Sequence, residues 1–268
     1  MAGVSEADMK LHVFGVGSGI EPNAGFHHTC LAIETENGLY FIDAGELGAY
    51  NAHLNGVDLL KTRAVFITHS HMDHVGGLGN LLWYIRKLCV AKKTKTKAPN
   101  IDIIAPEKDV FDATMMLLKN TEGDFVCDHT HTFIKTDEAL SYYSFDGELI
   151  VTAVHTDHLP QRNGEYRSYA YIIECEGKKL MFMGDMRLED IKRAVPDSGV
   201  DALFVETGHY PVNTVAQTVK DADKKIAHLF FVHHGKSVRV DIPKAQQTAE
   251  EIFGKNVTVT EEGKFYII

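Results

Sequence analysis

The chain has 268 residues, with 37 acidic and 27 basic side chains and a formal net charge of −10. Its 44% hydrophobic and 24% charged residues are ordinary for a globular protein, which excludes a disordered chain, a fibre or a coiled coil. No apolar run approaches the roughly 20 residues of a membrane-spanning helix. Met1–Lys10 also lacks the apolar core of an export signal. We therefore expect a cytoplasmic protein, with residues 1–268 forming one domain.

Short apolar runs between glycine-rich turns predict strands and helices along the whole chain. In the first half we expect strands at Leu11–Val16, Cys30–Glu34, Leu39–Ile42, Ala64–Thr68 and Ile101–Ala105, and helices at Gly77–Val90 and Pro106–Leu118. In the second half we expect strands at Leu149–Val154, Tyr169–Cys175, Lys179–Met183, Ala202–Val205 and Leu229–Val232, and helices at Met186–Ala194, Asn213–Lys224 and Pro243–Phe253. Val257–Thr260 and Phe265–Ile268 are expected to close the chain as a hairpin. Each half runs from a β-meander into alternating helices and strands, which predicts an α/β (α+β) fold with two facing sheets and helices outside.

Four side chains that bind metals gather in one short segment. His69, His71, Asp73 and His74 form the pattern His-x-His-x-Asp-His between an apolar strand and a helix. His69 and His71 are two residues apart, so their side chains leave the same side of an extended backbone. Imidazole and carboxylate ligands suit two Zn²⁺ ions, and they also accept Mn²⁺ or Fe²⁺. Four ligands in six residues are too many for one ion that also needs ligands from elsewhere, so the pattern predicts two metals in a shared site.

The remaining ligands are expected at the ends of other strands. His155 ends one strand, Asp185 follows another, and His233 ends a third with His234 beside it. Alone, each is ordinary, because a single histidine is more often a surface or core residue and Gly-Asp is usually a turn. Beside the histidine-rich segment they complete a site between two sheets. We prefer His233 to His234 because it directly follows the apolar strand.

The segment His69-Ser70-His71-Met72-Asp73-His74 resembles the signature of the metallo-β-lactamase superfamily. His155, Asp185 and His233 follow in the order of that family's later ligands, and the resemblance covers nearly the whole chain. It implies a four-layer αββα sandwich with the metals at the edge of the two sheets. It also implies that one metal is held by His69, His71 and His155, the other by Asp73, His74 and His233, and that Asp185 bridges both.

The segments Phe14–Gly19, Phe41–Glu46 and Ile104–Glu107 resemble the ribonuclease Z branch of this superfamily. That branch includes tRNA 3′-processing endonucleases and small cyclic-nucleotide phosphodiesterases, and it implies a homodimer that no apolar stripe in the sequence shows. The glycines of Phe14–Gly19 are spaced Gly-x-Gly-x-Gly before a β-type segment, which argues against a dinucleotide-binding loop. We expect Asp43 to support the ligand loops from behind.

The chain departs from the tRNA enzymes of that branch. They carry His-Glu-Ala-Thr where this chain has Val205-Glu206-Thr207-Gly208-His209, and Phe-Ser where it has His234-Gly235, and no Gly/Pro-rich arm is visible. The acidic net charge also disfavours a general nucleic-acid binder. We therefore favour a small phosphodiester such as a cyclic nucleotide, with a tRNA 3′-processing endonuclease or a non-catalytic metal-binding module as alternatives. The basic run Lys92–Lys97, most simply a solvated loop, keeps long RNA open as a phosphate-steering arm.

The predicted chemistry is hydrolysis. Two metals about 3.5–4 Å apart lower the pKa of a water held between them, and the hydroxide attacks phosphorus at neutral pH. We count Asp73 among the catalytic residues as well as the ligands. An acid must protonate the leaving oxygen, and His209 and His234 are the candidates, with His158 as a weaker one. Glu206 could orient His209.

Overall fold

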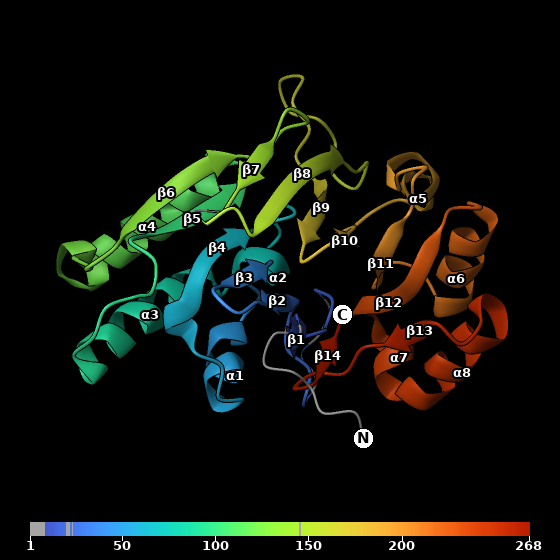
Figure 1. Ribbon diagram of the computed structural model, residues 1–268, viewed down its shortest axis with the longest axis horizontal. Coiled ribbons are helices and arrows are strands. Elements are labelled where there is room, and N and C mark those ends of the chain that lie inside the picture. The colour runs from blue at the N-terminus through green and yellow to red at the C-terminus, as the bar shows by residue number, and fades with distance from the viewer. Residues whose placement is uncertain (1–8, 20–21, 23, 145) are drawn as a thin grey trace.

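The computed structural model describes residues 9–19, 22, 24–144 and 146–268 (Figure 1). Residues 1–8, on which the expectation of no export signal depends, lie outside this part of the chain. Within the described ranges, no helix is long and apolar enough to cross a membrane.

Among the described residues the strands form two sheets of seven strands each. The first sheet has the order β14-β1-β2-β3-β4-β5-β6, with β1 at Lys10–Gly15, β2 at Cys30–Glu34, β3 at Leu39–Ile42, β4 at Thr62–Phe66, β5 at Asn100–Ala105, β6 at Thr130–Lys135 and β14 at Phe265–Ile267. The second has the order β13-β12-β11-β10-β9-β8-β7, with β7 at Ser141–Tyr143, β8 at Leu149–His155, β9 at Tyr169–Cys175, β10 at Lys178–Phe182, β11 at Val200–Thr207, β12 at Ile226–His234 and β13 at Val257–Val259. In both sheets an antiparallel meander passes into parallel strands, β3 to β6 and β10 to β13.

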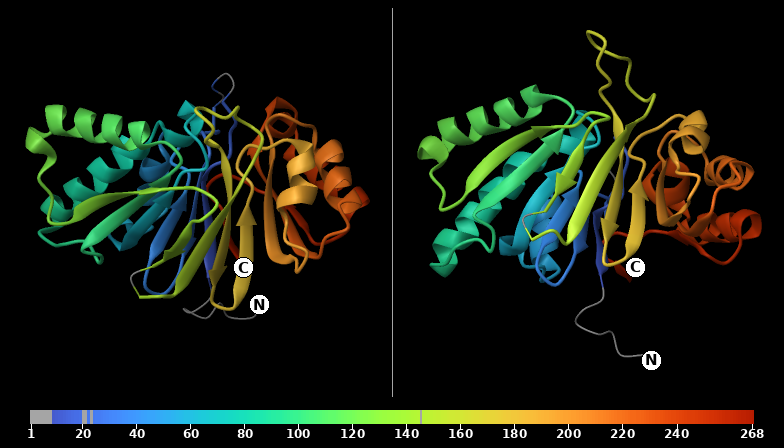
Figure 2. Two further views of the ribbon diagram at one scale, coloured as in Figure 1. Left: turned by 90° about the horizontal axis from the view of Figure 1, so that it is seen from above. Right: turned by 45° about the horizontal axis from the view of Figure 1, so that its top comes forward.

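Helices cover the outer face of each sheet (Figure 2). The first sheet carries α1 (Gly48–Leu54), α3 (Leu78–Lys92) and α4 (Lys108–Thr121), and the second carries α5 (Leu188–Ala194), α6 (Val212–Asp221) and α8 (Ile242–Phe253). Short helices complete the chain: η1 (Leu59–Lys61), α2 (Met72–Val75), η2 (Gly123–Phe125) and α7 (Lys236–Val240). One apolar core lies between the sheets and one lies under each helical layer. The predicted four-layer αββα sandwich is therefore confirmed.

The expected C-terminal hairpin is wrong. β13 pairs with β12 in the second sheet, whereas β14 pairs with β1 in the first. The chain crosses between the sheets at residues 260–264, where Val13 donates a backbone hydrogen bond to Lys264 at 3.0 Å. Two apolar segments separated by a turn can pair with each other or with two open sheet edges, and here both edges were available.

Candidate metal centre

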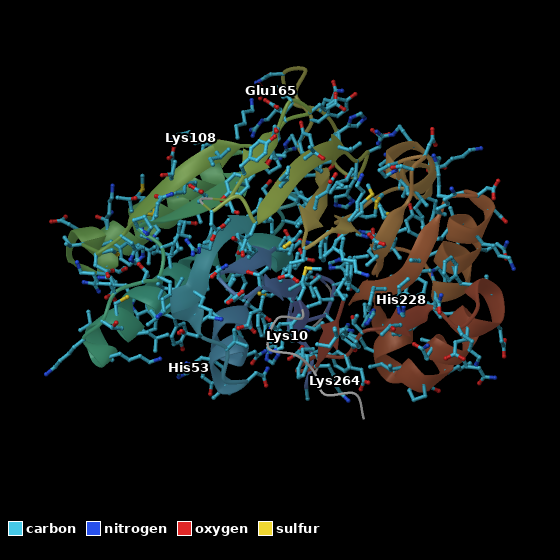
Figure 3. All side chains as sticks on the ribbon, in the orientation of Figure 1. Lys10, His53, Lys108, Glu165, His228 and Lys264 are labelled. Carbon is cyan, nitrogen blue, oxygen red and sulfur yellow. The ribbon has the colours of Figure 1, made fainter. Side chains whose placement is uncertain are left out.

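The carboxyl ends of several strands meet at one edge of the sandwich, and the predicted ligands follow them. The histidine-rich segment follows β4, Asp185 follows β10, and His233 lies near the end of β12. Glu206 is at the end of β11 with His209 just beyond it. Because β10, β11 and β12 are parallel neighbours, their ends place these residues side by side. Not every histidine joins them: His53 on α1 and His228 on β12 lie apart (Figure 3).

The carboxylate of Asp185 is the centre of the cluster. It is buried, and its oxygens lie near four ring Nε2 atoms: 3.2 Å from His233, 3.4 Å from His74, 3.5 Å from His158 and 3.7 Å from His69. Ligand atoms of His69, His71, His158 and Asp185 lie within 4.8 Å of one another, and the same holds for Asp73, His74 and His233. The arrangement therefore offers two adjacent groups of ligands, and the carboxylate of Asp185 lies between them.

Buried atoms in the cluster lack partners that a metal would supply. Among the described residues, Nε2 of His69, Nε2 of His74 and Oδ1 of Asp185 are buried without a hydrogen bond. An unpaired buried polar atom costs about 1–3 kcal/mol, so a protein rarely retains several together without a use. Imidazole nitrogens around a carboxylate are also the ligand set that divalent zinc, manganese or iron accepts. The residues present fit a metal centre.

Hydrogen bonds behind the rings aim Nε2 into the centre. Nδ1 of His233 lies 2.6 Å from the hydroxyl of Thr29, and Nδ1 of His69 lies 3.1 Å from that of Thr68. The Thr29 hydroxyl donates to the carbonyl of Gly17 and the Thr68 hydroxyl donates to Asp43, so each can accept from the ring N–H. The lone pair then belongs to Nε2, as a metal ligand requires.

A β-bulge turns His233 toward the centre. Glu206 pairs with Val232 but Thr207 pairs with His234, so His233 is the extra residue on β12, and its φ of 48° is unusual for a non-glycine residue. Bulges re-aim side chains beside active sites, and strained backbone persists where function requires it. The structure thus places His233, and not His234, beside Asp185.

The structure does not support His234 as the general acid that protonates the leaving oxygen. It is fully buried, its Nδ1 lies 2.9 Å from the hydroxyl of Thr207, and its Nε2 donates to the carbonyl of Thr260 at 2.9 Å. Burial lowers the pKa of His234 to about 4, so the ring is neutral at pH 7. His234 is a hydrogen-bonded core residue.

The structure does not bring His155 into the cluster either. β8 continues through His155, which pairs with Tyr169, and its ring stacks on Tyr166 with centroids 3.6 Å apart. Its Nδ1 lies 2.5 Å from Glu138. The chain turns only after this residue, and His158 takes the expected place, with Nε2 3.4 Å from Nδ1 of His71. The strand extends one residue further than the sequence predicted, which moves the ligand to the following loop.

Electrostatics within the cluster keep its carboxylate charged. Burial alone would raise the pKa of Asp185, but His233, His74 and His69 outweigh it and hold that pKa well below its usual range. Burial would lower the pKa of His74, but Asp43 and Asp185 hold it well above its usual range. Burial and the neighbouring His74 lower the pKa of His69. The ionised carboxylate of Asp185 and the neutral ring of His69 are in the form that binds metals, whereas the ring of His74 would release a proton on binding.

His209 stands at the rim of the centre, positioned by Glu206 as expected. Glu206 is fully buried and accepts from the backbone N–H of His209 at 2.9 Å and from its Nδ1 at 2.8 Å. The hydrogen bond to Glu206 raises the pKa of His209 to about 9. The side chain is 47% exposed and its Nδ1 lies 3.8 Å from Asp185. A protonated imidazole therefore faces the solvent side of the cluster.

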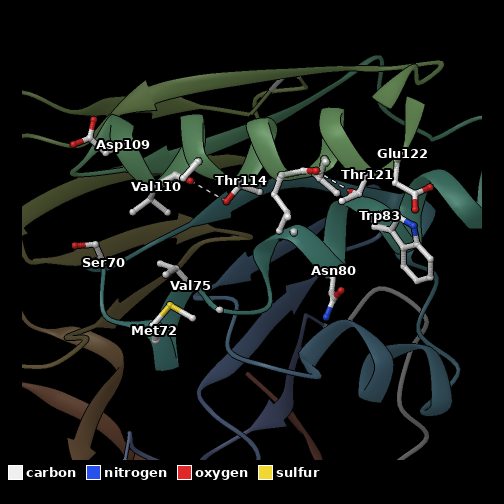
Figure 4. A pocket seen from close by; sticks show the side chains of 15 residues that line it. Ser70, Met72, Val75, Asn80, Trp83, Asp109, Val110, Thr114, Thr121 and Glu122 are labelled. Atoms are coloured by element: carbon white, nitrogen blue, oxygen red, sulfur yellow. Dashed lines mark hydrogen bonds between the residues drawn. The ribbon is translucent and has the colours of Figure 1, made fainter. Parts of the chain in front are cut away.

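A groove of about 770 Å³ adjoins the histidine-rich loop (Figure 4). It runs between α2, α3 and α4, and among its lining residues are Ser70, Met72, Trp83 and Val110. Ser70 donates to Glu107, which also forms a paired hydrogen bond with Arg167 at 3.0 and 3.1 Å. The groove thus shares the loop with the metal centre but contains none of its ligands.

Fold and site together define the class: a metal-dependent hydrolase of the metallo-β-lactamase fold. The metallo-beta-lactamase fold protein YhfI from Bacillus subtilis superposes with a TM-score of 0.70 at 18% identity, over 96% of this chain and 99% of that one. At this identity the likeness shows the fold alone.

The chain belongs to the Anti-Pycsar protein Apyc1 family, whose model matches residues 9–247. The Anti-Pycsar protein Apyc1 of Bacillus phage 010DV004 is 24% identical over 261 residues, 88% of this chain and 93% of that protein. Ribonuclease Z of Listeria innocua is 34% identical over 77 residues, 28% of this chain and 25% of that enzyme. The predicted relationship to the metallo-β-lactamase superfamily and its ribonuclease Z branch is confirmed.

Proposed function

We propose that the protein is a phosphodiesterase that hydrolyses a small nucleotide, in particular a cyclic nucleotide, with two zinc ions. The observation that carries this proposal is the buried carboxylate of Asp185 between two groups of imidazoles, together with the unpartnered Nε2 atoms of His69 and His74. In this assignment His69, His71 and His158 would hold one ion, Asp73, His74 and His233 would hold the other, and Asp185 would contribute to both groups. A metal pair supplies positive charge that lowers the pKa of water and offsets charge developing on a phosphate.

The chain's own residues supply the proton for the leaving group. His209 is protonated at neutral pH, half exposed and beside the cluster, so it can donate to the leaving oxygen of a bound phosphodiester. The buried carboxylate of Glu206 holds its ring in place through Nδ1, which leaves Nε2 for the substrate. Asp73 contributes an oxygen 3.5 Å from Nε2 of His74 and serves as ligand rather than as proton donor.

A small substrate is favoured over RNA. Similarity to the Apyc1 relative spans 88% of this chain, whereas similarity to the Listeria ribonuclease Z spans 28%. The ribonuclease relationship supports cleavage of a phosphodiester bond, and the net charge of −10 opposes association with a long polyanion. RNA processing remains the second candidate because the exposed run Lys92–Lys97 could attract phosphates.

A hydrolysis screen with product analysis tests the proposal. Protein loaded with zinc, and separately with manganese, is incubated with bis(p-nitrophenyl) phosphate, cyclic mononucleotides, cyclic oligonucleotides and precursor tRNA. We expect hydrolysis of the generic ester and opening of a cyclic nucleotide. Both activities and the metal bound at the Asp185 cluster should be lost in Asp185→Ala and His69→Ala but retained in His53→Ala. Cleavage of precursor tRNA alone, or no turnover by fully metallated protein, would contradict the proposal.

A further inference from the structure

A second group of metal-binding side chains lies away from the catalytic cluster. Cys127 and His129 precede β6, and His131 is its second residue. One ligand atom from each of the three lies within 4.8 Å of the others. β6 is parallel to β5 and β5 to β4, so the start of β6 is at the opposite end of the sheet from the loop that follows β4. The two clusters are therefore separate sites.

The spacing explains why the three side chains meet. Cys127, His129 and His131 occupy alternate positions of a segment that enters a strand, and alternate side chains of extended backbone leave the same side. The rings of His129 and His131 stand edge to face with centroids 4.8 Å apart. The sequence thus presents a thiol and two imidazoles to one point.

Both imidazoles bring an unsatisfied nitrogen to this place. Within the described part of the chain, Nε2 of His129 and Nε2 of His131 are buried without a hydrogen-bond partner. The His129 side chain has no exposed surface. Two unpartnered buried imidazole nitrogens beside a thiol would be costly unless an ion or another acceptor completes them.

The other nitrogen of His129 is already engaged. Nδ1 lies 2.8 Å from a carboxylate oxygen of Asp128. A carboxylate that accepts from one ring nitrogen fixes the ring and directs the opposite nitrogen to a metal, as in many zinc sites. Cys89, on α3, forms a separate group of neighbouring ligand atoms with Asp128 and His129. That group does not include Cys127 or His131.

We propose that Cys127, His129 and His131 bind one Zn²⁺ ion, with water in the fourth position. A thiolate with two imidazoles is a borderline-soft set that suits zinc better than calcium or magnesium. Tetrahedral zinc separates its ligand atoms by roughly 3.3–3.8 Å, so modest side-chain rotation closes the present spacing. His131 also borders a surface groove with Phe111 and Met115 of α4, so the proposed site lies near the surface of the protein. The ion would tie the segment before β6 to the sheet edge.

Cobalt substitution tests this site independently of the catalytic one. The proposed catalytic ligands are imidazoles and carboxylates, so a cobalt–thiolate charge-transfer band in the near ultraviolet can come only from a cysteine ligand. We expect the band in the cobalt-loaded full chain, and its retention in Asp185→Ala, which empties the catalytic centre. Cys127→Ser should abolish the band while phosphodiesterase activity stays within about twofold of the parent. Cys89→Ser is the matched control and should keep the band.

Metal counting keeps the test decisive. Circular dichroism establishes whether each variant is folded, and His131→Asn should bind about one zinc equivalent fewer than the parent. The proposal is overturned if the loaded parent shows no thiolate band, or if the band survives Cys127→Ser. A band lost in Cys89→Ser and kept in Cys127→Ser would also overturn this ligand set. Loss of phosphodiesterase activity alone bears on the catalytic centre and leaves these readouts unaffected.

Discussion

Nδ1 of His74 donates a hydrogen bond to Oδ2 of Asp43 across 2.7 Å, at the base of the candidate metal centre. The other carboxylate oxygen of Asp43 accepts from the backbone N–H of Thr68 at 2.8 Å. One buried carboxylate thus fixes both the start of the histidine-rich loop and the ring orientation of its last histidine. The sequence-based expectation that Asp43 supports the ligand loops agrees with this geometry.

Replacing Asp43 should weaken the centre without removing a ligand. In Asp43→Ala the His74 ring loses its acceptor, and we expect a 10–100-fold loss of metal affinity or activity, as found for such supporting carboxylates. Metal titration and hydrolysis of bis(p-nitrophenyl) phosphate measure it. Asp102→Asn is the control, because Asp102 is a partly buried carboxylate of the same sheet that accepts from Tyr142 instead. Equal effects of the two variants would mean that Asp43 contributes only to stability.

His158 and His155 give a direct test of the ligand set. His158→Ala removes a ring whose Nε2 lies 3.5 Å from Asp185, so we expect loss of one metal and at least a 100-fold fall in activity. His155→Ala removes a ring stacked on Tyr166 and should leave metal content and activity within about twofold. Elemental analysis and kinetics of the two purified variants decide between them. If His155→Ala lost metal and activity while His158→Ala kept both, His155 would be the ligand, as the family resemblance implied.

The contrast between these two histidines shows what the sequence could predict. Apolar runs define most strands to within two residues, because each buries both faces or one face in the sandwich. The spacing of the residues from His69 to His74 is enough to predict that their side chains lie close together. A ligand beyond a strand end depends on where pairing stops, and the register of β8 with Tyr169 was not readable from local composition. The later ligand therefore shifted by three residues.

Other features required knowledge of tertiary contacts. β14 pairs with β1 because the sheet edge was open, which no property of Phe265–Ile267 itself reveals. The role of His234 depended on a bulge one residue before it. The alternation of Cys127, His129 and His131 was visible in the sequence. The observation that points to a metal is the burial of the unpaired nitrogens of the two histidines, which the sequence does not show. The expected homodimer and cytoplasmic location stay predictions.

His209 should matter most for substrates with a poor leaving group. If it protonates the leaving oxygen, His209→Ala should lower kcat by about 10²–10⁴-fold for a nucleotide with an alkoxide leaving group. Bis(p-nitrophenyl) phosphate releases a stable phenolate and should lose far less. The ratio of the two effects is the measurement, and His53→Ala, which removes an exposed histidine of α1, is the control. Equal losses on both substrates would assign His209 to metal or phosphate binding.

The basic run Lys92–Lys97 is too far from the centre to touch a mononucleotide. It begins at the last residue of α3, whose 15 residues span roughly 22 Å from the histidine-rich loop. Replacing Lys92, Lys93, Lys95 and Lys97 with glutamine should weaken binding of long RNA by about tenfold at low salt and reduce its salt dependence. Turnover of a cyclic mononucleotide should not change. Filter binding across a salt series measures the affinity for long RNA. Equal losses for long RNA and for the cyclic mononucleotide would exclude a steering arm.

The ion pair of Glu34 should make the free energy of unfolding depend on pH. The hydrogen bond from His12, at 2.8 Å, with a contribution from Lys61, lowers the pKa of Glu34 to about 2 against burial. A carboxylate with a depressed pKa in the folded state stabilises above its usual pKa, near 4.5, and this stabilisation is lost as pH falls toward 2. We expect Glu34→Gln to lower the free energy of unfolding by about 1–2 kcal/mol near neutral pH, after allowance for solvent screening, and by less than about half of that near pH 3.

Urea unfolding at several pH values measures this difference, because each titration gives the free energy of unfolding of parent and variant directly. The matched control is Glu251→Gln, since Glu251 is exposed on α8 and accepts from the neutral side chain of Gln247 at 2.9 Å. That variant should change stability by less than about 0.5 kcal/mol at every pH. A pH-independent effect of Glu34→Gln would show that its packing, rather than its charge, stabilises the first sheet.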